Sequence, residues 1–416
     1  MQLINLKIAF CLGPKYAACT LMIELRQEIF LAQTWCRTLW GSTQVVFKLI
    51  SCIRIVTRNG DLFMDKKVVA VLFGGASNEH EISKLSAASV ISALNEEKYF
   101  ILPIYITRDG RWFLYDGGRE NIKNLQWEKF ATPCVLSPHA CHHGILRLVG
   151  DKFKVMHVDV VFPVLHGKNG EDGTVQGLLE MAGIPYVGSG VLASATCMDK
   201  ARCNLIADKI GLRQGEYAVF GRDCVENGIE AVAKKIRYKI GYPCFVKPVR
   251  TGSSVGVSLA ANKKELLAAL LEAAKHDCKI IVEKGISGRE LECAVLGNEN
   301  PEASVVGEIM YEGKFYDYDT KYISNTSKAL IPAEIPEEVA EKVRRMSLEI
   351  YKACECKGLA RVDFFLEEAT GEVLFNEVNT MPGFTNISMY PMLWRAAGMT
   401  DTDLVDKLVG FALEEN

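Results

Sequence analysis

The sequence predicts an N-terminal α/β domain with a parallel sheet, followed by two lobes of the α+β class. Its 416 residues suffice for two or three domains. Up to residue 187, short apolar runs alternate with segments of helical periodicity, as in parallel sheets covered by helices. Beyond it, strands follow one another beside long helices, which is typical of α+β lobes. We expect a first domain over residues 64–187, a central lobe over 188–283 and a C-terminal lobe over 284–416.

The first domain opens with a strand that is expected to be buried on both faces. Val68–Phe73 is a continuous apolar run, and Gly74 and Gly75 interrupt it. Apolar residues at helical spacing follow, and later strands end in polar turns. The further elements that we expect are a helix over Ile82–Leu94, strands over Phe100–Ile106 and Val158–Leu165, and a helix over Val175–Ala182 that ends at Gly183.

The two later lobes combine short strands with longer helices. In the central lobe we expect helices over Asp199–Ile210 and Lys263–Lys275 and strands over Pro243–Pro248 and Lys279–Glu283. In the C-terminal lobe we expect strands over Leu291–Leu296, Ser304–Tyr311, Arg361–Leu366 and Glu372–Asn376, and a helix over Pro336–Cys354.

The composition argues against several classes of protein. Hydrophobic residues make up 49% of the chain and charged residues 24%, an ordinary balance for a globular protein. The formal net charge of −3 gives no reason to expect nucleic acid or an anionic membrane as a partner. The 14 cysteines are scattered without a CxxC pair, so we interpret them as reduced and mostly buried. We therefore expect a cytoplasmic protein.

Residues 1–63 differ from the rest of the chain. They carry more basic than acidic residues, and Lys48 and Arg54 break their apolar stretches. No stretch approaches the roughly 20 apolar residues of a membrane span, and no clear signal-peptide cleavage site is present. Because Met64 leads almost directly into the first strand, we interpret residues 1–63 as a non-native or disordered extension. An anchor or targeting segment is the alternative.

One motif combines three oxygen-bearing side chains with a guanidinium. Arg361 and Asp363 lie two residues apart on one expected strand, and Glu377 and Asn379 lie two apart after the next. Side chains two apart share a face of a strand, so all four should converge on one surface. Carboxylate and amide oxygens suit Mg²⁺, which also binds substrate phosphates. A solvated strand face with an Arg–Asp pair is the alternative, and the apolar flanks argue against it.

Two further motifs could bind a nucleotide. Lys247 ends a buried strand, and the loop Thr251–Gly256 after it offers backbone N–H groups and hydroxyls to phosphate oxygens. The loop is not a Walker A motif, because GK[ST] is missing. The segment Glu283–Ile286 could bind an adenine edge, and Glu290 could bind ribose hydroxyls. An ordinary hairpin and a surface turn are the respective alternatives.

Two polar turns follow strands of the first domain, at the ends where open α/β sheets bind ligands. Glu79 stands at a helix start, where it could receive a substrate ammonium or could simply cap the helix. His166 opens a glycine-bracketed turn, and a lone histidine in such a place is more often structural than catalytic.

Two other motifs carry no functional prediction. Gly188–Ala193 matches the dinucleotide fingerprint G-x-G-x-x-A, but no strand-end acid lies at the expected spacing, which argues against a Rossmann oxidoreductase. His139–His143 holds three histidines and a cysteine without the separated ligand pairs of a zinc site, so we expect an exposed loop.

Taken together and in order, segments from Met64 to the C-terminus resemble the D-alanine–D-alanine ligase family of the ATP-grasp superfamily. The segments are VLFGGASNEHEIS, PVLHGKNGEDGTVQG, CMDK, FVKPVRTGSSVGV, EKGISGRE, FYDYDTKY, ARVDFF and NEVNTMPGFTNISMYP. The resemblance implies a three-lobed ATP-grasp fold with a Rossmann-like, substrate-binding first domain and ATP between the other two lobes. It also implies the ATP-dependent joining of two D-alanines through D-alanyl phosphate, for peptidoglycan synthesis, by a homodimer.

The resemblance further implies a role for individual residues. Those that bind ATP are Lys200, Lys247, Glu283, Lys284, Ile286 and Glu290, with Lys321 at the phosphates. Those that hold two Mg²⁺ or Mn²⁺ ions are Asp363, Glu377 and Asn379. The first D-alanine lies near His166 with its ammonium at Glu79, within a hydrogen-bonded set that includes Ser253 and Tyr322. Arg361 and the Gly383 amide lie at the reacting carboxylate, and Ser388 and Met389 bind the carboxylate end of the second amino acid.

Water would destroy the acyl phosphate that the resemblance implies, so a lid must close over the site. We expect Phe315–Ser327 to be this lid, because Gly313 precedes it and its tyrosines can cover the site. Inside the closed site, Arg361 and the Gly383 amide would stabilise the tetrahedral oxyanion.

The identity of the second substrate depends on finer features of the sequence. Vancomycin-resistance ligases of the same family use D-serine or D-lactate. Lys321 and Tyr322 resemble the pair of dipeptide-forming members, which argues against D-lactate, and Met389 stands where resistance-type ligases typically carry arginine, which favours D-alanine. Stretches such as FPVLHGKNGEDGT also resemble the D-Ala–D-Ser subgroup, which stays the alternative. A non-catalytic nucleotide-binding protein and a ligase for other amino acids are further hypotheses, which the complete motif set disfavours.

Overall fold

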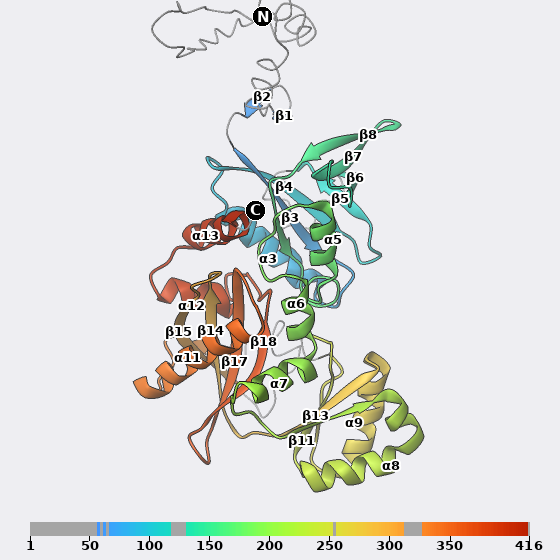
Figure 1. Ribbon diagram of the computed structural model, residues 1–416, viewed down its shortest axis with the longest axis vertical. Coiled ribbons are helices and arrows are strands. Elements are labelled where there is room, and N and C mark those ends of the chain that lie inside the picture. Colours follow the sequence, from blue (N-terminus) through green and yellow to red (C-terminus); the bar gives the residue numbers. More distant parts are fainter. Residues whose placement is uncertain are drawn as a thin grey trace, which may run out of the picture. The chain divides into compact units, whose positions relative to one another are not determined.

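The computed structural model describes residues 56–58, 61–63, 66–117, 130–252, 255–311 and 327–414 (Figure 1). The chain divides into two compact units, Met1–Lys66 and Lys67–Asn416. In the first unit, β1 (Val56–Arg58) pairs antiparallel with β2 (Asp61–Phe63). The interpretation of residues 1–63 as an extension otherwise lies outside the described residues and stays a prediction.

The second unit begins with a seven-stranded sheet in the order β8-β7-β6-β5-β4-β3-β9. Three strands are parallel, as expected, and form its buried part: β3 (Lys67–Gly74), β4 (Tyr99–Ile106) and β9 (Val160–Val164). The sheet is mixed, because four further strands extend it as antiparallel hairpins: β5 (Trp112–Tyr115), β6 (Ala131–Leu136), β7 (Gly144–Val149) and β8 (Lys152–His157). The expected helices are α3 (His80–Ala93), which packs on β3, and α5 (Thr174–Ala182), which ends at Gly183 with a φ of 64°.

The central part holds a four-stranded antiparallel sheet, in the order β10-β13-β11-β12, under two packed helices. Its strands are β10 (Tyr217–Gly221), β11 (Cys244–Pro248), β12 (Ser258–Ala260) and β13 (Lys279–Lys284), and its covering helices are α8 (Arg222–Lys239) and α9 (Lys263–His276). Two shorter helices precede the sheet: α6 (Val191–Met198) and α7 (Lys200–Lys209), which begins at Asp199 because that side chain accepts from the Arg202 N–H.

The last part is a five-stranded antiparallel sheet in the order β16-β15-β14-β17-β18. The strands are β14 (Gly288–Leu296), β15 (Glu302–Tyr311), β16 (Ser327–Leu330), β17 (Leu359–Glu367) and β18 (Val373–Asn379). Alternate residues of β14 serve opposite faces: Cys293 packs in a core with α11 (Glu337–Ala353), whereas Ala294 packs in a core with α12 (Met389–Ala396).

One hydrophobic core joins the two ends of the second unit. Val69 and Phe73 of β3 share it with Tyr390 of α12 and Leu408 of α13 (Asp401–Glu414). Helix α13 packs on α3 and β9, and Asp406 accepts hydrogen bonds from Lys98 and Tyr99. The C-terminal helix is therefore part of the first domain's packing. Among the described helices, none combines the length and apolarity that crossing a bilayer requires.

We expect Leu408→Ala to lower the free energy of unfolding of the second unit by about 2–5 kcal/mol, the range for a buried leucine that leaves a cavity. Leu408 has no exposed surface and lies in the shared core. Urea unfolding measures the change, with Lys407→Ala on the exposed side of the same helix as the control. Equal effects of the two variants would contradict the role of this core.

Candidate active site

A cleft of about 540 Å³ brings together most of the residues that the sequence singled out. Those that line it are Glu79, His166, Lys200, Lys247, Glu283, Lys284, Ile286, Glu290, Arg361, Asp363, Glu377, Asn379 and Gly383. Three others, Ser253, Lys321 and Tyr322, lie outside the described residues, as does almost all of the expected lid Phe315–Ser327.

Strand register builds the acidic centre of the cleft. In the sheet, Asp363 of β17 lies directly between Glu292 of β14 and Glu377 of β18, so three carboxylates form a row across neighbouring strands. Two residues along β17, Arg361 lies opposite Asn379. Because side chains two apart share a face, these groups all point to one side, as the spacing predicted.

Arg361 holds this row together. It donates two hydrogen bonds of 2.7 Å to the two oxygens of Asp363, and its Nε lies 2.9 Å from Glu292 Oε2. Asn379 Nδ2 donates to the same Asp363 at 2.9 Å. Burial alone would lower the pKa of Arg361, but Asp363 and Glu292 raise it well above its usual value. The guanidinium is therefore charged whenever these carboxylates are ionised.

Two lysines complete the charged lining from the side of the central sheet. Lys200 Nζ lies 2.9 Å from Glu377 Oε2, and Lys247 Nζ lies 2.6 Å from Glu283 Oε2. Among the described lining residues, seven acidic side chains, one of them Glu171, face four lysine and arginine side chains. A cleft with this excess of acids repels a polyphosphate unless cations accompany it. Its oxygen donors are those that Mg²⁺ and Mn²⁺ accept, so the residues fit divalent ions.

Glu79 links three loops at the other end of the cleft. It is buried and precedes α3 without making a side-chain capping hydrogen bond, which argues against the capping alternative. A Cβ placed on Gly167 would come within 2.3 Å of Glu79 Oε2, and one on Gly252 within 2.8 Å. A side chain at either position would therefore displace the end of the Glu79 side chain, and at Gly167 the φ of 69° favours glycine as well.

His166 is held at both ring nitrogens. Its Nδ1 lies 3.0 Å from the Met381 carbonyl oxygen and its Nε2 lies 3.0 Å from Ser86 Oγ. A carbonyl can only accept, so Nδ1 carries the proton and Nε2 accepts from the serine hydroxyl. The bond to Met381 connects the turn after β9 to the loop that contains Gly383, and the bond to Ser86 connects that turn to α3. His166 therefore lines the cleft as a positioning group, and its role towards a substrate stays a prediction.

Two acids of the cleft received no role from the sequence. Glu292 continues the row of carboxylates, and its place two residues after Glu290 on one strand was the available signal. Glu171 accepts from the Gly167 N–H at 2.7 Å and from the Met381 N–H at 3.2 Å. Burial and the charge of Glu79 raise the pKa of Glu171 to about 8. Its turn was recognised in the sequence, but burial beside another acid depends on the tertiary fold.

The residues expected at the second amino acid do not line the cleft. Met389 is buried in the apolar core, with its sulfur packed on Gly307. Ser388 lies beside the cleft, because a Cβ on Gly383 would come within 2.8 Å of its Oγ. The described residues therefore bring Ser388, but not the Met389 side chain, to the edge of the site.

Two family models match this chain: "D-ala D-ala ligase N-terminus" over residues 68–189 and "D-ala D-ala ligase C-terminus" over residues 206–410. The chain belongs to the D-alanine–D-alanine ligase family. All the site residues named above except Lys200, which falls between the two matches, lie within the matched ranges. The expected family, the ATP-grasp fold class and a ligase activity are thereby confirmed, and family membership implies the use of ATP.

Individual relatives and solved structures agree with this family. The chain is 49% identical over 363 residues to the D-alanine–D-alanine ligase of Acetivibrio thermocellus (84% of this chain, 96% of that protein) and 48% identical over 355 residues to that of a Thermoanaerobacter species (85% and 98%). The structure of the VanG D-Ala:D-Ser ligase from Enterococcus faecalis matches with a TM-score of 0.76 at 42% identity (83% and 99%). The D-alanine–D-alanine ligase from Coxiella burnetii matches with 0.72 at 35% (84% and 96%).

The raised pKa of Glu171 predicts a particular pH dependence of stability in this ligase. The unfolded carboxyl ionises near its ordinary value, about 4.3, and the folded one at about 8. The stabilising contribution is therefore present at low pH and is lost as the pH rises through about 8. Because the charge of Glu79 helps to raise this pKa, Glu79→Gln should lose less stability between about pH 5 and pH 9 than the unmodified chain.

Urea unfolding at about pH 5, 7 and 9 measures this difference in slope. Glu97→Gln, which neutralises an exposed carboxylate, is the control and should follow the unmodified chain. If Glu79→Gln also follows it, the two acids are not coupled in the way described.

Proposed function

We propose that this ligase joins two D-alanine molecules to D-alanyl-D-alanine at the expense of ATP, for peptidoglycan precursor synthesis in the cytoplasm. The observation that carries the proposal is the charged guanidinium of Arg361, fixed beside a row of three carboxylates in a cleft that also reaches the buried Glu79. The names of the curated relatives support the same reaction.

ATP would lie between the central and C-terminal sheets. The residues that we assign to it, Lys200, Lys247, Glu283, Lys284, Ile286 and Glu290, line that side of the cleft. Lys247 is the last residue but one of β11 and pairs with Glu283 of β13, so its ammonium is held in the cleft that both residues line. Ile286 packs on Gly215, which leaves an apolar surface beside backbone groups for a planar base.

We assign the divalent ions to Asp363, Glu377 and Asn379. When bound, the ions would supply positive charge that neutralises the ATP phosphates. In their absence Arg361 and Lys200 neutralise Asp363 and Glu377. The two carboxylates are thus already held in position before any ion arrives, which lowers the cost of ordering the site.

The first step makes a poor electrophile reactive. A carboxylate oxygen of the first D-alanine attacks the γ-phosphorus, ADP leaves, and the mixed anhydride D-alanyl phosphate forms. In the second step the neutral amine of the second D-alanine attacks the carbonyl carbon and phosphate leaves. Arg361 and the Gly383 N–H would stabilise the oxyanion of that tetrahedral intermediate. Glu79 would receive the ammonium of the first D-alanine, and so orient its carboxylate towards Arg361.

D-serine is the second candidate for the incoming amino acid, because VanG carries that activity in its name. The identities of 49% and 48% to the Acetivibrio and Thermoanaerobacter ligases, which are named for D-alanine, exceed the 42% identity to VanG and support D-alanine. Met389 is buried in the apolar core and does not line the cleft, so its side chain offers no polar atom to a serine hydroxyl there. An apolar pocket rejects an added hydroxyl only by about 10²-fold, so weak use of D-serine is expected.

An ATP-dependent phosphate-release assay with mass analysis of the products tests the acceptor. With D-alanine and D-serine at equal concentration, we expect mainly D-alanyl-D-alanine. Mainly D-alanyl-D-serine would replace the acceptor assignment and leave the ligase mechanism intact. Absence of phosphate release with either amino acid would overturn the proposed reaction.

We expect Arg361→Lys to lower kcat/KM by about 10²- to 10³-fold, the range for the loss of one oxyanion-stabilising donor. Lysine cannot form the two parallel bonds to Asp363 and still reach Glu292. Steady-state kinetics of the folded variant measures the loss. Arg213→Lys, at an exposed pair with Glu372, is the matched control and should keep the full rate. An Arg361→Lys enzyme with unchanged kcat/KM would exclude Arg361 from the chemistry.

A further inference from the structure

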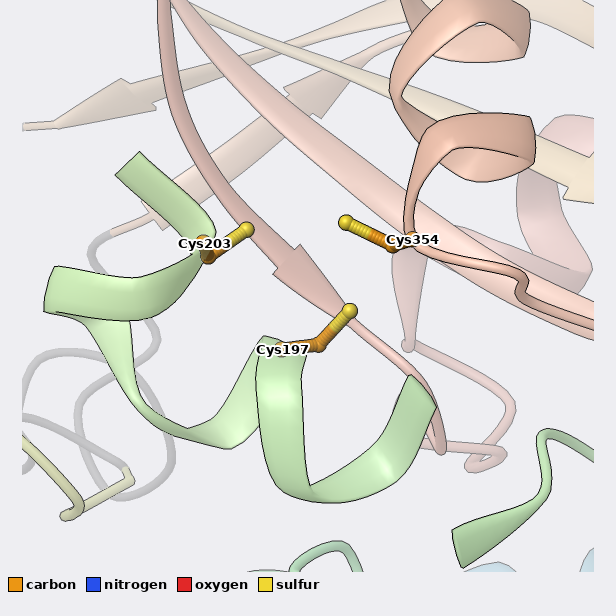
Figure 2. A group of neighbouring side chains, drawn as sticks. All are labelled: Cys197, Cys203 and Cys354. Carbon is orange, nitrogen blue, oxygen red and sulfur yellow. The ribbon is translucent and has the colours of Figure 1, made fainter. Parts of the chain in front are cut away.

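Three buried cysteines from distant parts of the chain point into one small space (Figure 2). Cys197 lies at the end of α6, Cys203 on α7 and Cys354 directly after α11. Their Sγ atoms all lie within 4.8 Å of one another. A fourth, Cys356, places its Sγ 3.8 Å from that of Cys197. The proposed ligase chemistry uses none of these thiols.

The spacing of the sulfurs approaches that of a tetrahedral thiolate site. Zinc–sulfur bonds are about 2.3 Å long, so two sulfurs of a tetrahedron lie about 3.8 Å apart. The Cys197–Cys356 pair already has this separation. The sulfurs of Cys197, Cys203 and Cys354 need to approach one another by at most about 1 Å. All four cysteines are in the free thiol form.

We propose that Cys197, Cys203 and Cys354 bind a thiophilic divalent cation of the zinc type, with Cys356 as the fourth ligand. Thiolates select such ions over Mg²⁺, which prefers oxygen. Each cysteine that ligates gives up its proton to solvent as its sulfur–metal bond forms, so binding exchanges one ion for the released protons. The site is therefore chemically separate from the carboxylates of the cleft.

The surroundings of the cluster suit a closed structural site. All four side chains are at most 5% exposed and belong to one apolar core with Val343, Ile350 and Phe375. Cys197 also lines the active-site cleft, which offers an entry path for the ion.

A bound ion would connect the segment that carries Lys200 to the C-terminal sheet. Cys197 and Cys203 flank Lys200, whose ammonium contacts Glu377, whereas Cys354 and Cys356 lie between α11 and β17. Because the folded chain gathers the four thiols that the unfolded chain disperses, the ion should bind the folded chain more tightly and raise the melting temperature.

Cobalt(II) titration of the full-length, reduced chain tests the proposal. We expect one equivalent to produce the intense visible bands of tetrahedral cobalt together with thiolate-to-metal charge transfer in the near ultraviolet. The melting temperature should rise in step with these bands. X-ray absorption of the zinc-loaded chain should show a sulfur shell at about 2.3 Å. An oxygen and nitrogen shell alone, or no charge-transfer band, would overturn the proposal.

Matched variants locate the ion. The triple variant Cys197→Ala, Cys203→Ala, Cys354→Ala should lose the charge-transfer band. Cys244→Ala, in a separate apolar core, and Cys141→Ala, at an exposed cysteine beside His139, should keep it. A band that survives in the triple variant would place the ion on other cysteines and overturn the proposal. A disulfide between two of these four cysteines, found by mass analysis of protein prepared with the metal ion and without reductant, would also overturn the proposal.

Discussion

The active site depends on one buried guanidinium. Arg361 is 7% exposed, and its charge is acceptable there only because Asp363 and Glu292 lie on the same face of neighbouring strands. A slip of one residue between β14 and β17 would turn one partner to the opposite face and leave an uncompensated charge in the interior. The need to compensate the charge of Arg361 therefore fixes the register of β14 and β17 as well as the chemistry of the site. The carboxylate row, the lysines that face it and the loops that close on Glu79 all take their positions relative to this centre.

Much of the secondary structure follows from local pattern. The buried run at Val68–Phe73 and the periodic helix of Pro336–Cys354 became β3 and α11 with small shifts at the ends. The strands β5 to β8 were not assigned, because β5 has only four residues and β6 to β8 are partly exposed and lack a continuous apolar run. Helix α6 was obscured by the glycines before it, which resemble a dinucleotide loop. Short elements such as these owe their conformation to packing, which a local pattern does not contain.

The site residues also divide into those that a local pattern predicts and those that depend on tertiary packing. Pairs of residues two apart on a strand could be predicted, since alternation puts Arg361 and Asp363 on one face whatever the rest of the fold. The neighbours across strands could not, and so Glu292 was missed. Glu171 acquires its raised pKa from burial near Glu79, which is 92 positions away in the chain. Likewise, the four cysteines looked scattered in sequence and meet only because α6, α7 and α11 pack against the same sheet.

The packing of α13 on β9 and α3 affects how the chain can fold during synthesis. The strands of the first sheet leave the ribosome early, but one face of their core is covered by residues 401–414, which are made much later. A nascent chain that has completed β9 therefore still exposes apolar surface around Val160 and Phe162. The N-terminal sheet therefore cannot reach its final burial before residues 401–414 have been synthesised, although all its strands precede them by more than 200 residues.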